Sequence, residues 1–275
     1  MRRTESIPLP RLETISSRDN RWLKQFRQAL RAGQATEDGY VGAEGIHVVE
    51  EALRAGLDIP AILVSSTGER YLEQLAPWLG PAVHLLRTTD RLFSGVADTQ
   101  TPQGVAALVR PRTARFDDIV RGAALVAVLC GIQDPGNVGT ILRSAEAFGA
   151  SGAVASRGTA DPYAPKSLRA SAGSALRLPI LTGASLPILM AQLRVAGLQL
   201  CAASAREGAP PAEADLRGPV AFFIGNEGTG VPPEVERSCD QRILIPLSEA
   251  VESLNAAVAA SILFYEAARQ RASAS

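Results

Sequence analysis

The second half of the chain alternates short apolar runs with patterns of helical spacing. Several of the runs are continuous, which is typical of strands covered on both faces of a sheet. The segments between several of them carry apolar residues three or four positions apart, as helices do. This alternation predicts an α/β domain with a mostly parallel sheet. The expected strands are 124–129, 153–155, 178–181, 198–203, 220–224 and 242–245, and the expected helices are 138–148, 168–172, 186–195 and 253–271.

A shorter alternation of the same kind precedes this domain. Between residues 36 and 110, helical patterns at 45–55 and 69–78 are interleaved with apolar runs at 61–65, 82–86 and 105–109. This predicts a small α/β domain over 36–110. The turn-rich, charged stretch 111–122 predicts a linker, so the larger domain would occupy 123–275.

The first 35 residues are basic in an otherwise balanced chain. The whole chain has 28 basic and 28 acidic residues, which gives no general attraction to polyanions. Residues 1–35 hold eight basic and three acidic ones. A helical pattern at 18–31, capped by Ser16 or Ser17, has one apolar and one basic face. This predicts a basic helical arm over 1–35 that contacts RNA, and a solvated polar face is the alternative. The residues expected at that contact are Arg21, Lys24 and Arg27.

Several classes of protein do not match this composition. No apolar run approaches the roughly 18–20 residues that cross a bilayer, and no apolar stretch of the signal-peptide type follows the N-terminal arginines. Three widely separated cysteines argue against a disulfide framework, and the two histidines complete no zinc-ligand spacing. We therefore expect a cytoplasmic protein with no membrane association and no metal site.

Three loops of the second half carry candidate chemistry. The first, 134–149, leaves a buried strand and enters a helix, which is where α/β proteins place ligands. Within it, Asn137 is either a functional residue or simply the helix cap. Arg143 lies beside apolar neighbours, where an arginine calls for a partner such as phosphate or carboxylate.

The second loop, 222–234, has three glycines in six residues, which allow close approach of backbone to a ligand. Its spacing is not that of the dinucleotide-binding fingerprint. The third segment, 243–262, passes through Ser253 and Asn255 into an alanine-rich helix. Ser253 can be the cap of that helix, which is the structural alternative to a functional role.

In this order, the three loops resemble the motifs of the SpoU (TrmH-like) branch of the SPOUT RNA methyltransferases. The similarity is carried jointly by Asn-x-Gly-x-x-x-Arg-Ser-Ala at 137–145, Gly-Asn-Glu-Gly-x-Gly at 225–230 and Ile-Pro-Leu…Glu-Ser-Leu-Asn at 245–255. The segment 41–53 also resembles, less specifically, the start of that family's L30e-like substrate-binding domain.

The resemblance implies a C-terminal SPOUT-type parallel sheet with a trefoil knot, preceded by the small L30e-like domain. Because true knots are very rare, the knot rests on the resemblance alone. The implied activity is transfer of a methyl group from S-adenosylmethionine to a ribose 2′-hydroxyl of RNA, with rRNA favoured over tRNA. A homodimer formed through the C-terminal domain is also expected.

The resemblance implies two sets of site residues. The catalytic set is Asn137, Arg143, Glu227, Ser253 and Asn255. The cofactor-binding set is Ala203, Gly225, Ile245, Leu247 and Leu254.

Two readings of Arg143 remain open at this point. The family's motif-one arginine is often described as the base, but a guanidinium rarely gives up its proton. It can instead act as a cation that stabilises the developing alkoxide. Glu227 would hold either the glycine loop or Arg143, and Ser253 and Asn255 would orient cofactor or ribose. The alternative outside enzymology is a non-catalytic RNA-binding or ribosome-associated protein, and the Ser-Leu-Asn motif disfavours base methylation.

Overall fold

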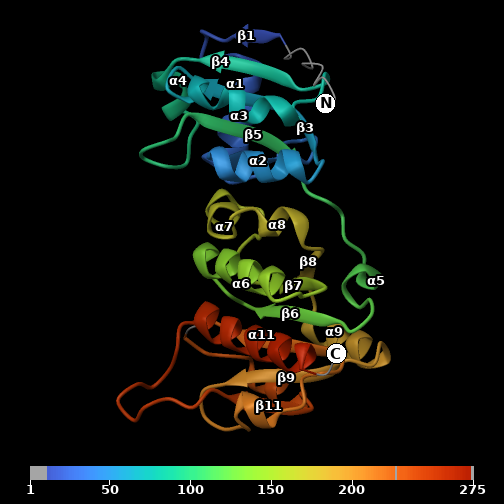
Figure 1. Cartoon of the computed structure of the whole chain (residues 1–275). Coiled ribbons are helices and arrows are strands. Elements are labelled where there is room, and N and C mark those ends of the chain that lie inside the picture. Colours follow the sequence, from blue (N-terminus) through green and yellow to red (C-terminus); the bar gives the residue numbers. More distant parts are fainter. Residues whose placement is uncertain (1–10, 227, 274–275) are drawn as a thin grey trace. The chain divides into compact units, whose positions relative to one another are not determined.

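The computed structural model describes residues 11–226 and 228–273. Its contacts divide the chain into two units (Figure 1). The first comprises the residues up to Arg112 together with Tyr163–Leu176, and the second comprises Thr113–Pro162 and Arg177–Ser275. Each is built on its own sheet, so the expected α/β class with two sheets is confirmed. In the described part of the chain, no helix is both long and apolar enough to cross a membrane.

The sheet of the first unit is mixed, with the strand order β1-β4-β3-β5-β2. Strands β1, β4 and β3 are parallel, and β5 runs antiparallel to both β3 and β2. The predicted strands near 61, 82 and 105 are confirmed with shifts of a few residues, and the first two strands were not predicted. The bounds are β1 Leu12–Thr14, β2 Val41–Glu44, β3 Asp58–Ser65, β4 His84–Thr88 and β5 Val105–Arg110.

Strand β2 escaped prediction because its four residues include a glycine and a carboxylate. A Cβ at Gly42 would lie 2.6 Å from Leu30 Cδ2, so only glycine fits there. The Glu44 side chain is buried, and its carboxylate accepts the backbone N–H of Asp98 at 2.8 Å and bonds to Thr99. A buried charge is tolerated when it is hydrogen-bonded in this way.

The N-terminal helix α1 (Arg21–Leu30) belongs to the core of the first unit, so the expectation of a separate arm is wrong for these residues. Leu23, Phe26 and Leu30 are fully buried among the sheet residues. The cap is Asn20, not Ser16 or Ser17, and its side chain accepts the N–H of Trp22 at 2.8 Å. Residues 1–10 lie outside the described residues.

The other helices of the first unit are short. Helix α2 follows its prediction closely, whereas the single helix expected at 69–78 is a succession of short turns. The segment Tyr163–Leu176 joins this unit through α7, although the expected domain boundaries assigned it to 123–275. The bounds are α2 Ile46–Arg54, η1 Gly68–Tyr71, α3 Leu72–Leu75, η2 Ala76–Trp78, α4 Asp90–Ser94 and α7 Pro165–Ala170.

The sheet of the second unit has six strands in the order β11-β9-β10-β6-β7-β8, and every pair is parallel. All six predicted strands are present. Their buried apolar residues explain why the pattern was readable from sequence. The bounds are β6 Leu125–Cys130, β7 Gly152–Ser156, β8 Ile180–Ala184, β9 Gln199–Ser204, β10 Val220–Gly225 and β11 Gln241–Leu244.

Helices cover both faces of this sheet. Phe223 of β10 packs in the same apolar cluster as residues of α9 and α10. Its neighbour Phe222 meets Phe264 of α11 with ring centroids 5.7 Å apart. Because successive strand residues point to opposite faces, α11 covers the other face. The helices are α5 Phe116–Ile119, α6 Pro135–Ala147, α8 Ser174–Arg177, α9 Leu186–Val195, η3 Pro211–Glu213, α10 Pro233–Ser238 and α11 Ala256–Ala272.

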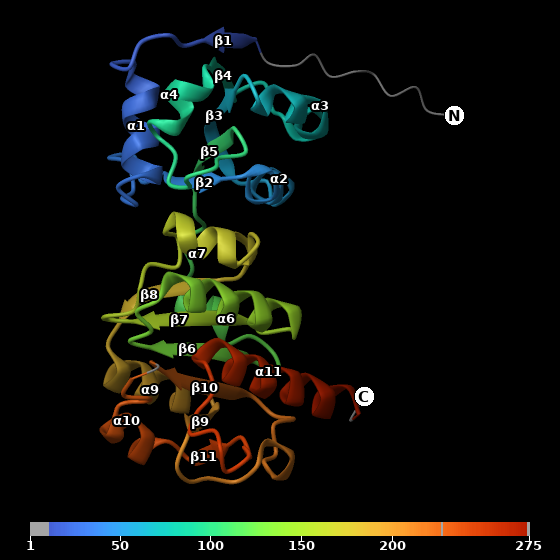
Figure 2. The ribbon, with the colours of Figure 1, turned by 90° about the vertical axis from the view of Figure 1, so that its left-hand side faces the viewer.

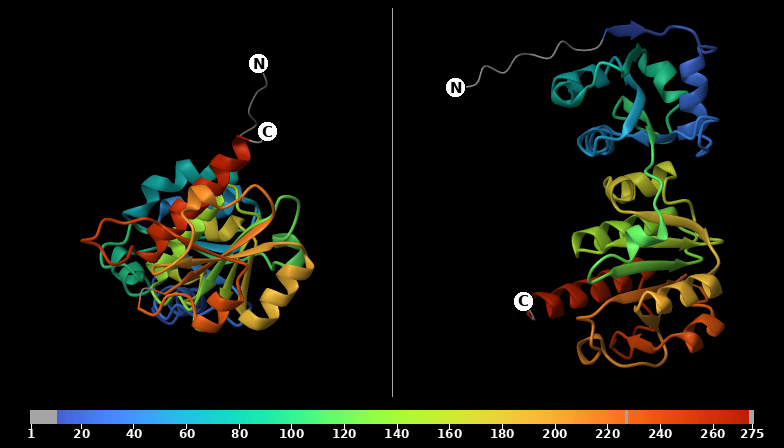
Figure 3. Two further views of the ribbon diagram at one scale, coloured as in Figure 1. Left: turned by 90° about the horizontal axis from the view of Figure 1, so that it is seen from below. Right: turned by 90° about the vertical axis from the view of Figure 1, so that its right-hand side faces the viewer.

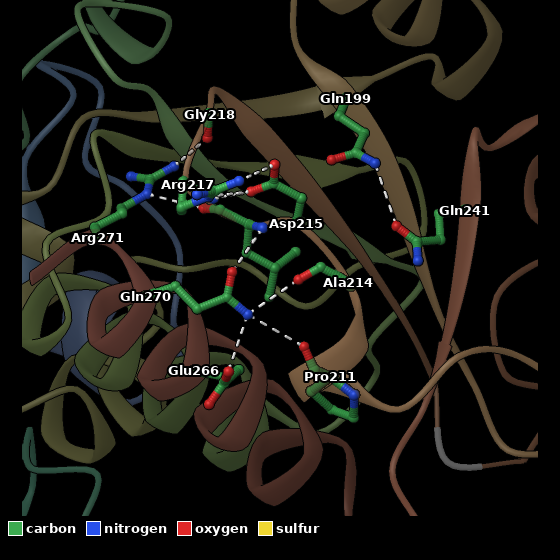
Figure 4. Close-up of polar contacts among 11 residues, drawn as sticks. Gln199, Pro211, Ala214, Asp215, Arg217, Gly218, Gln241, Glu266, Gln270 and Arg271 are labelled. Atoms are coloured by element: carbon green, nitrogen blue, oxygen red, sulfur yellow. Dashed lines mark hydrogen bonds and ion pairs between the residues drawn. The ribbon is translucent and has the colours of Figure 1, made fainter. Parts of the chain in front are cut away.

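The C-terminal helix α11 lies beside α6 (Figure 2) and runs along the sheet of the second unit (Figure 3, red). Its far end is held by polar side chains (Figure 4). Gln270 accepts the N–H of Leu216 at 2.9 Å and donates to the carbonyl of Ala214 at 3.0 Å. Arg271 donates to the carbonyls of Gly218 at 2.7 Å and Ala123 at 2.8 Å. The trefoil knot stays a prediction.

Candidate active site

The three motif loops all begin at one edge of the parallel sheet. The loops follow β6, β10 and β11, and parallel strands have their carboxyl ends at the same edge. Strands β6 and β10 are neighbours, and the chain continues from β6 towards β7 and β8 on one side, with β9 and β11 on the other. Such a point of reversal is where open α/β sheets bind ligands. The strand order therefore places the candidate site between the loops that follow β6 and β10.

The first two site residues that the structure brings together are Asn137 and Asn255. The Asn255 amide nitrogen donates to Asn137 Oδ1 at 3.0 Å. Asn255 Oδ1 accepts the N–H groups of Ala257 at 2.9 Å and Val258 at 3.2 Å, so Asn255 is the cap of α11. The two acceptor bonds fix the orientation of the amide, which must then present its NH₂ group to Asn137. One side chain thus starts α11 and joins it to α6.

The helix caps proposed from sequence were both displaced. Asp134 caps α6 and accepts the N–H of Gly136 at 3.2 Å, with Pro135 in the first helical turn. Asn137 is therefore inside the helix, and its side-chain oxygen is engaged by Asn255. Ser253 lies exposed two residues before the cap of α11, so it does not start that helix.

Arg143 lies on α6 with an exposed side chain. Within the described residues, no ion pair or hydrogen bond involves its guanidinium. The carboxylate one turn further along the helix, Glu146, is bound by Arg177 in a two-pronged ion pair, with both N–O distances 2.7 Å. Arg143 is thus an exposed cation on the helix that follows β6, with its nearest helical carboxylate already occupied.

The glycine-rich loop after β10 is tightly folded. A Cβ at position 225 would overlap the backbone of Gly230 and Val231, so Gly225 is required by packing. Asn226 Oδ1 accepts the N–H groups of Gly228 at 3.0 Å and Thr229 at 2.7 Å, which holds the turn. Glu227 lies outside the described residues.

The remaining expected cofactor residues lie at the same sheet edge. Ala203 is near the end of β9 in register with Ile243, and Ile245 follows β11 directly. Leu247 is 39% exposed, and Leu254 is half-buried just before the cap of α11. Apolar side chains beside glycine backbone suit an adenosine and a thioether chain, because small-molecule sites combine an apolar lining with a few polar groups. These residues therefore fit S-adenosylmethionine.

Cysteine chemistry does not fit this unit. Burial raises the pKa of the Cys201 thiol to about 12 and also raises that of Cys130. The pKa of Cys239 is raised to about 12, again mainly by burial and then by the nearby Asp240. Since the thiolate is the nucleophile, these three cysteines are packing residues.

The expected RNA contacts lie on α1 of the first unit. Arg21 and Lys24 are exposed, and Arg27 is partly exposed. Arg21 also lies over the ring of Trp22, 5.1 Å from its centroid. The basic face predicted from the sequence is therefore present at the surface of this unit.

Comparison with known proteins decides the family. Residues 124–265 match the SpoU rRNA methylase family, and residues 20–107 match the MRM3-like substrate binding domain. The chain belongs to the SpoU rRNA methylase family. The second match places α1 within the substrate-binding domain, in agreement with its packing.

Individual relatives match along nearly the whole chain. A 23S rRNA guanosine 2′-O-methyltransferase of Bacillus subtilis is 31% identical over 92% of this chain and 98% of its own length. An uncharacterized tRNA/rRNA methyltransferase of Synechocystis is 35% identical over 96% of both chains. The crystal structure of the SpoU methyltransferase AviRb from Streptomyces viridochromogenes with AdoMet superposes with a TM-score of 0.82, at 29% identity over 92% of this chain and 99% of that one.

The motif analysis missed the groups that surround Arg143. The Glu146–Arg177 ion pair joins residues 31 positions apart, and Ser144 lies 2.6 Å from Ser261 Oγ, 117 positions away. Glu146 lies within the helix that carries the first motif, and this was the one available signal. Its partner Arg177 becomes apparent only when α8 is placed against α6.

Proposed function

We propose that this protein transfers the methyl group of S-adenosylmethionine to a ribose 2′-hydroxyl of rRNA. The observation that carries the proposal is the convergence of three family motifs at one edge of a parallel sheet. The hydrogen bond between Asn137 and Asn255 joins the first motif to the third. Relatives that match nearly the whole chain are 2′-O-methyltransferases of 23S rRNA or were solved with AdoMet. A cytoplasmic location follows from an rRNA substrate.

When bound, S-adenosylmethionine supplies an electrophilic methyl group on a sulfonium. The glycine turn at 225–230 and the segment 245–255 would hold it, largely through backbone groups, with Leu247 and Leu254 against its apolar parts. Holding the two reactants in line can itself supply several kcal/mol of the barrier. The protein's first contribution is therefore positioning.

The second contribution is charge. Arg143 is an exposed guanidinium, and its pKa above about 12 keeps it protonated. We assign it to the ribose 2′-oxygen and a neighbouring phosphate, where a fixed cation favours the developing alkoxide. Ser253, on the exposed segment before Asn255, would orient ribose or cofactor by a hydrogen bond. The roles of these residues are proposals that mutation can test.

The competing function is a non-catalytic RNA-binding protein on the same scaffold. The two differ in a direct measurement, because the enzyme binds S-adenosylmethionine and methylates RNA, whereas the scaffold protein binds RNA alone. Mass-spectrometric mapping of ribose methylation in rRNA and tRNA from cells lacking the gene would identify the nucleotide. An unchanged methylation map, together with no cofactor binding in calorimetry, would reject the proposed function.

Arg143→Ala tests the assignment of the cation. The rate of single-turnover methylation of the mapped RNA should fall on the order of 10²–10³-fold, as it does when one preorganised donor is removed. The affinity for S-adenosylmethionine should stay nearly intact, because the cofactor loops follow β10 and β11 rather than β6. A near-normal rate would make Arg143 a structural residue.

We further propose that two copies associate through α11 of the second unit. Val258 and Tyr265 are 48% and 54% exposed, seven positions apart, with the partly exposed Ile262 between them. This forms an apolar stripe on a helix that is otherwise packed against α6. Light scattering should give about twice the 28.9 kDa chain mass at micromolar concentration, and Tyr265→Asp should halve it. Ile188→Asp, at a residue of α9 that is 63% exposed, is the matched control. A mass equal to one chain would reject the dimer.

The basic face of α1 is proposed to add RNA affinity without choosing the nucleotide. Contacts with phosphates position a protein but carry no sequence information. Neutralising Arg21, Lys24 and Arg27 should weaken RNA binding and reduce its salt dependence by roughly one unit per lost contact. The mapped methylation position should not change. An unaltered salt slope would show that this face is only solvated.

A further inference from the structure

The charge on α6 is arranged around one ion pair. Arg177, the last residue of α8, donates from Nε and from a terminal nitrogen to the two carboxylate oxygens of Glu146, both at 2.7 Å. The two side chains are 32% and 28% exposed, so solvent screens this pair less than it screens a fully exposed one. The two-pronged geometry is the strong form of an arginine–carboxylate contact.

Glu146 lies three residues after Arg143 on the same helix. Residues at this spacing are neighbours on a helix surface, with Cβ atoms about 5–6 Å apart, and opposite charges there attract each other. Arg143 has an exposed side chain that is long enough to reach a carboxylate one turn away. Without Arg177, Glu146 would be the nearest anion on α6 available to Arg143.

We propose that Arg177 is a positioning residue that holds the Glu146 carboxylate away from Arg143. This inference rests on the proposed function, because it concerns the cation assigned to the 2′-oxygen. A carboxylate that pairs with Arg143 would both turn its guanidinium away from RNA and cancel part of its charge. Arg177 prevents this by occupying both oxygens of Glu146 from the opposite side of the pair. The ion pair thus keeps the catalytic cation free of an internal partner.

Two single substitutions break the same ion pair with opposite consequences for Arg143. Arg177→Gln frees the carboxylate and leaves it beside Arg143, whereas Glu146→Gln removes the carboxylate altogether. A carboxylate about 6 Å from a guanidinium near the surface is expected to lower the single-turnover rate about tenfold. Arg177→Gln should therefore lose about tenfold in rate, and Glu146→Gln should stay near the wild-type rate. The double variant should recover nearly all of the loss.

The asymmetry separates this role from a merely structural one, since both single variants lose the same ion pair. Arg177→Lys, which can still bind the carboxylate with one charge, should recover most of the rate. Arg194→Gln, which breaks the more exposed pair with Asp240 at 3.1 Å in the same unit, is the control and should leave the rate unchanged. The affinity for S-adenosylmethionine should be the same in every variant.

The experiment is single-turnover methylation of the mapped rRNA fragment, with circular dichroism to verify folding and calorimetry for cofactor binding. Equal losses in Arg177→Gln and Glu146→Gln, or a double variant no faster than Arg177→Gln, would overturn the inference. So would a wild-type rate in Arg177→Gln. A wild-type protein that methylates no RNA would instead reject the proposed function, and the inference with it.

Discussion

Asn255 has two roles that substitution can separate. Its side-chain oxygen caps α11 through two backbone N–H groups, and its amide nitrogen donates to Asn137 on α6. Asn255→Asp keeps an oxygen for the cap and loses the amide donor. Asn255→Ala loses both. Comparing the two variants therefore measures the cap and the bridge independently.

The expected losses follow from these contacts. Removing an N-cap costs about 1 kcal/mol, and losing a side-chain hydrogen bond costs about 1 kcal/mol more. Asn255→Ala should therefore lower the free energy of unfolding of the second unit by about 2 kcal/mol. In Asn255→Asp the negative charge at the helix N-terminus offsets about 0.5 kcal/mol, which leaves a loss of about 0.5 kcal/mol.

The two units can be followed by different probes in urea. Both tryptophans, Trp22 and Trp78, lie in the first unit, so their fluorescence should be unaffected by changes at Asn255. Circular dichroism, which also reports α11, should show the shift. Asn20 is the matched control, because it caps α1 by one bond to Trp22 N. Asn20→Ala should shift the fluorescence transition by about 1 kcal/mol and Asn20→Asp hardly at all. Equal losses in Asn255→Ala and Asn255→Asp would refute the separation of roles.

Two further predictions concern the loop after β10 and the cysteines. Gly225→Ala should abolish S-adenosylmethionine binding in calorimetry, because the added Cβ would overlap the backbone at Gly230 and Val231, whereas Gly228→Ala, whose Cβ would lie 3.7 Å from Asn226 Oδ1, should bind nearly normally; similar affinities in the two would contradict this packing. Iodoacetamide at pH 8 should modify Cys239 far more slowly in the native protein than in urea, since a pKa raised to about 12 keeps the thiol protonated. Rapid native labelling, followed by mass spectrometry, would show that this thiol is not held in its protonated form.

The accuracy of the sequence analysis followed the kind of interaction involved. The six strands of the second unit were predicted because buried parallel strands leave continuous apolar runs. The helix starts were wrong by two or three residues because Asp134 and Asn255 compete with other good caps nearby, and only the folded chain selects among them. Strand β2 was missed because Glu44 is buried by hydrogen bonds to residues more than 50 positions away. The site residues of α6 and α11 were found through the motifs, whereas Arg177 required the tertiary structure.

The anchoring of α11 has a consequence for when this protein can become active during synthesis. Arg271 bonds to the carbonyl of Ala123 across 148 positions of sequence, and the helix that it ends begins at Asn255. Contacts of such long range form late, because the intervening chain must be ordered first. A chain still attached to the ribosome by its last residues cannot dock α11 along its full length. The junction of Asn255 with Asn137 should therefore be completed only after release, which delays RNA methylation until translation of the whole chain has ended.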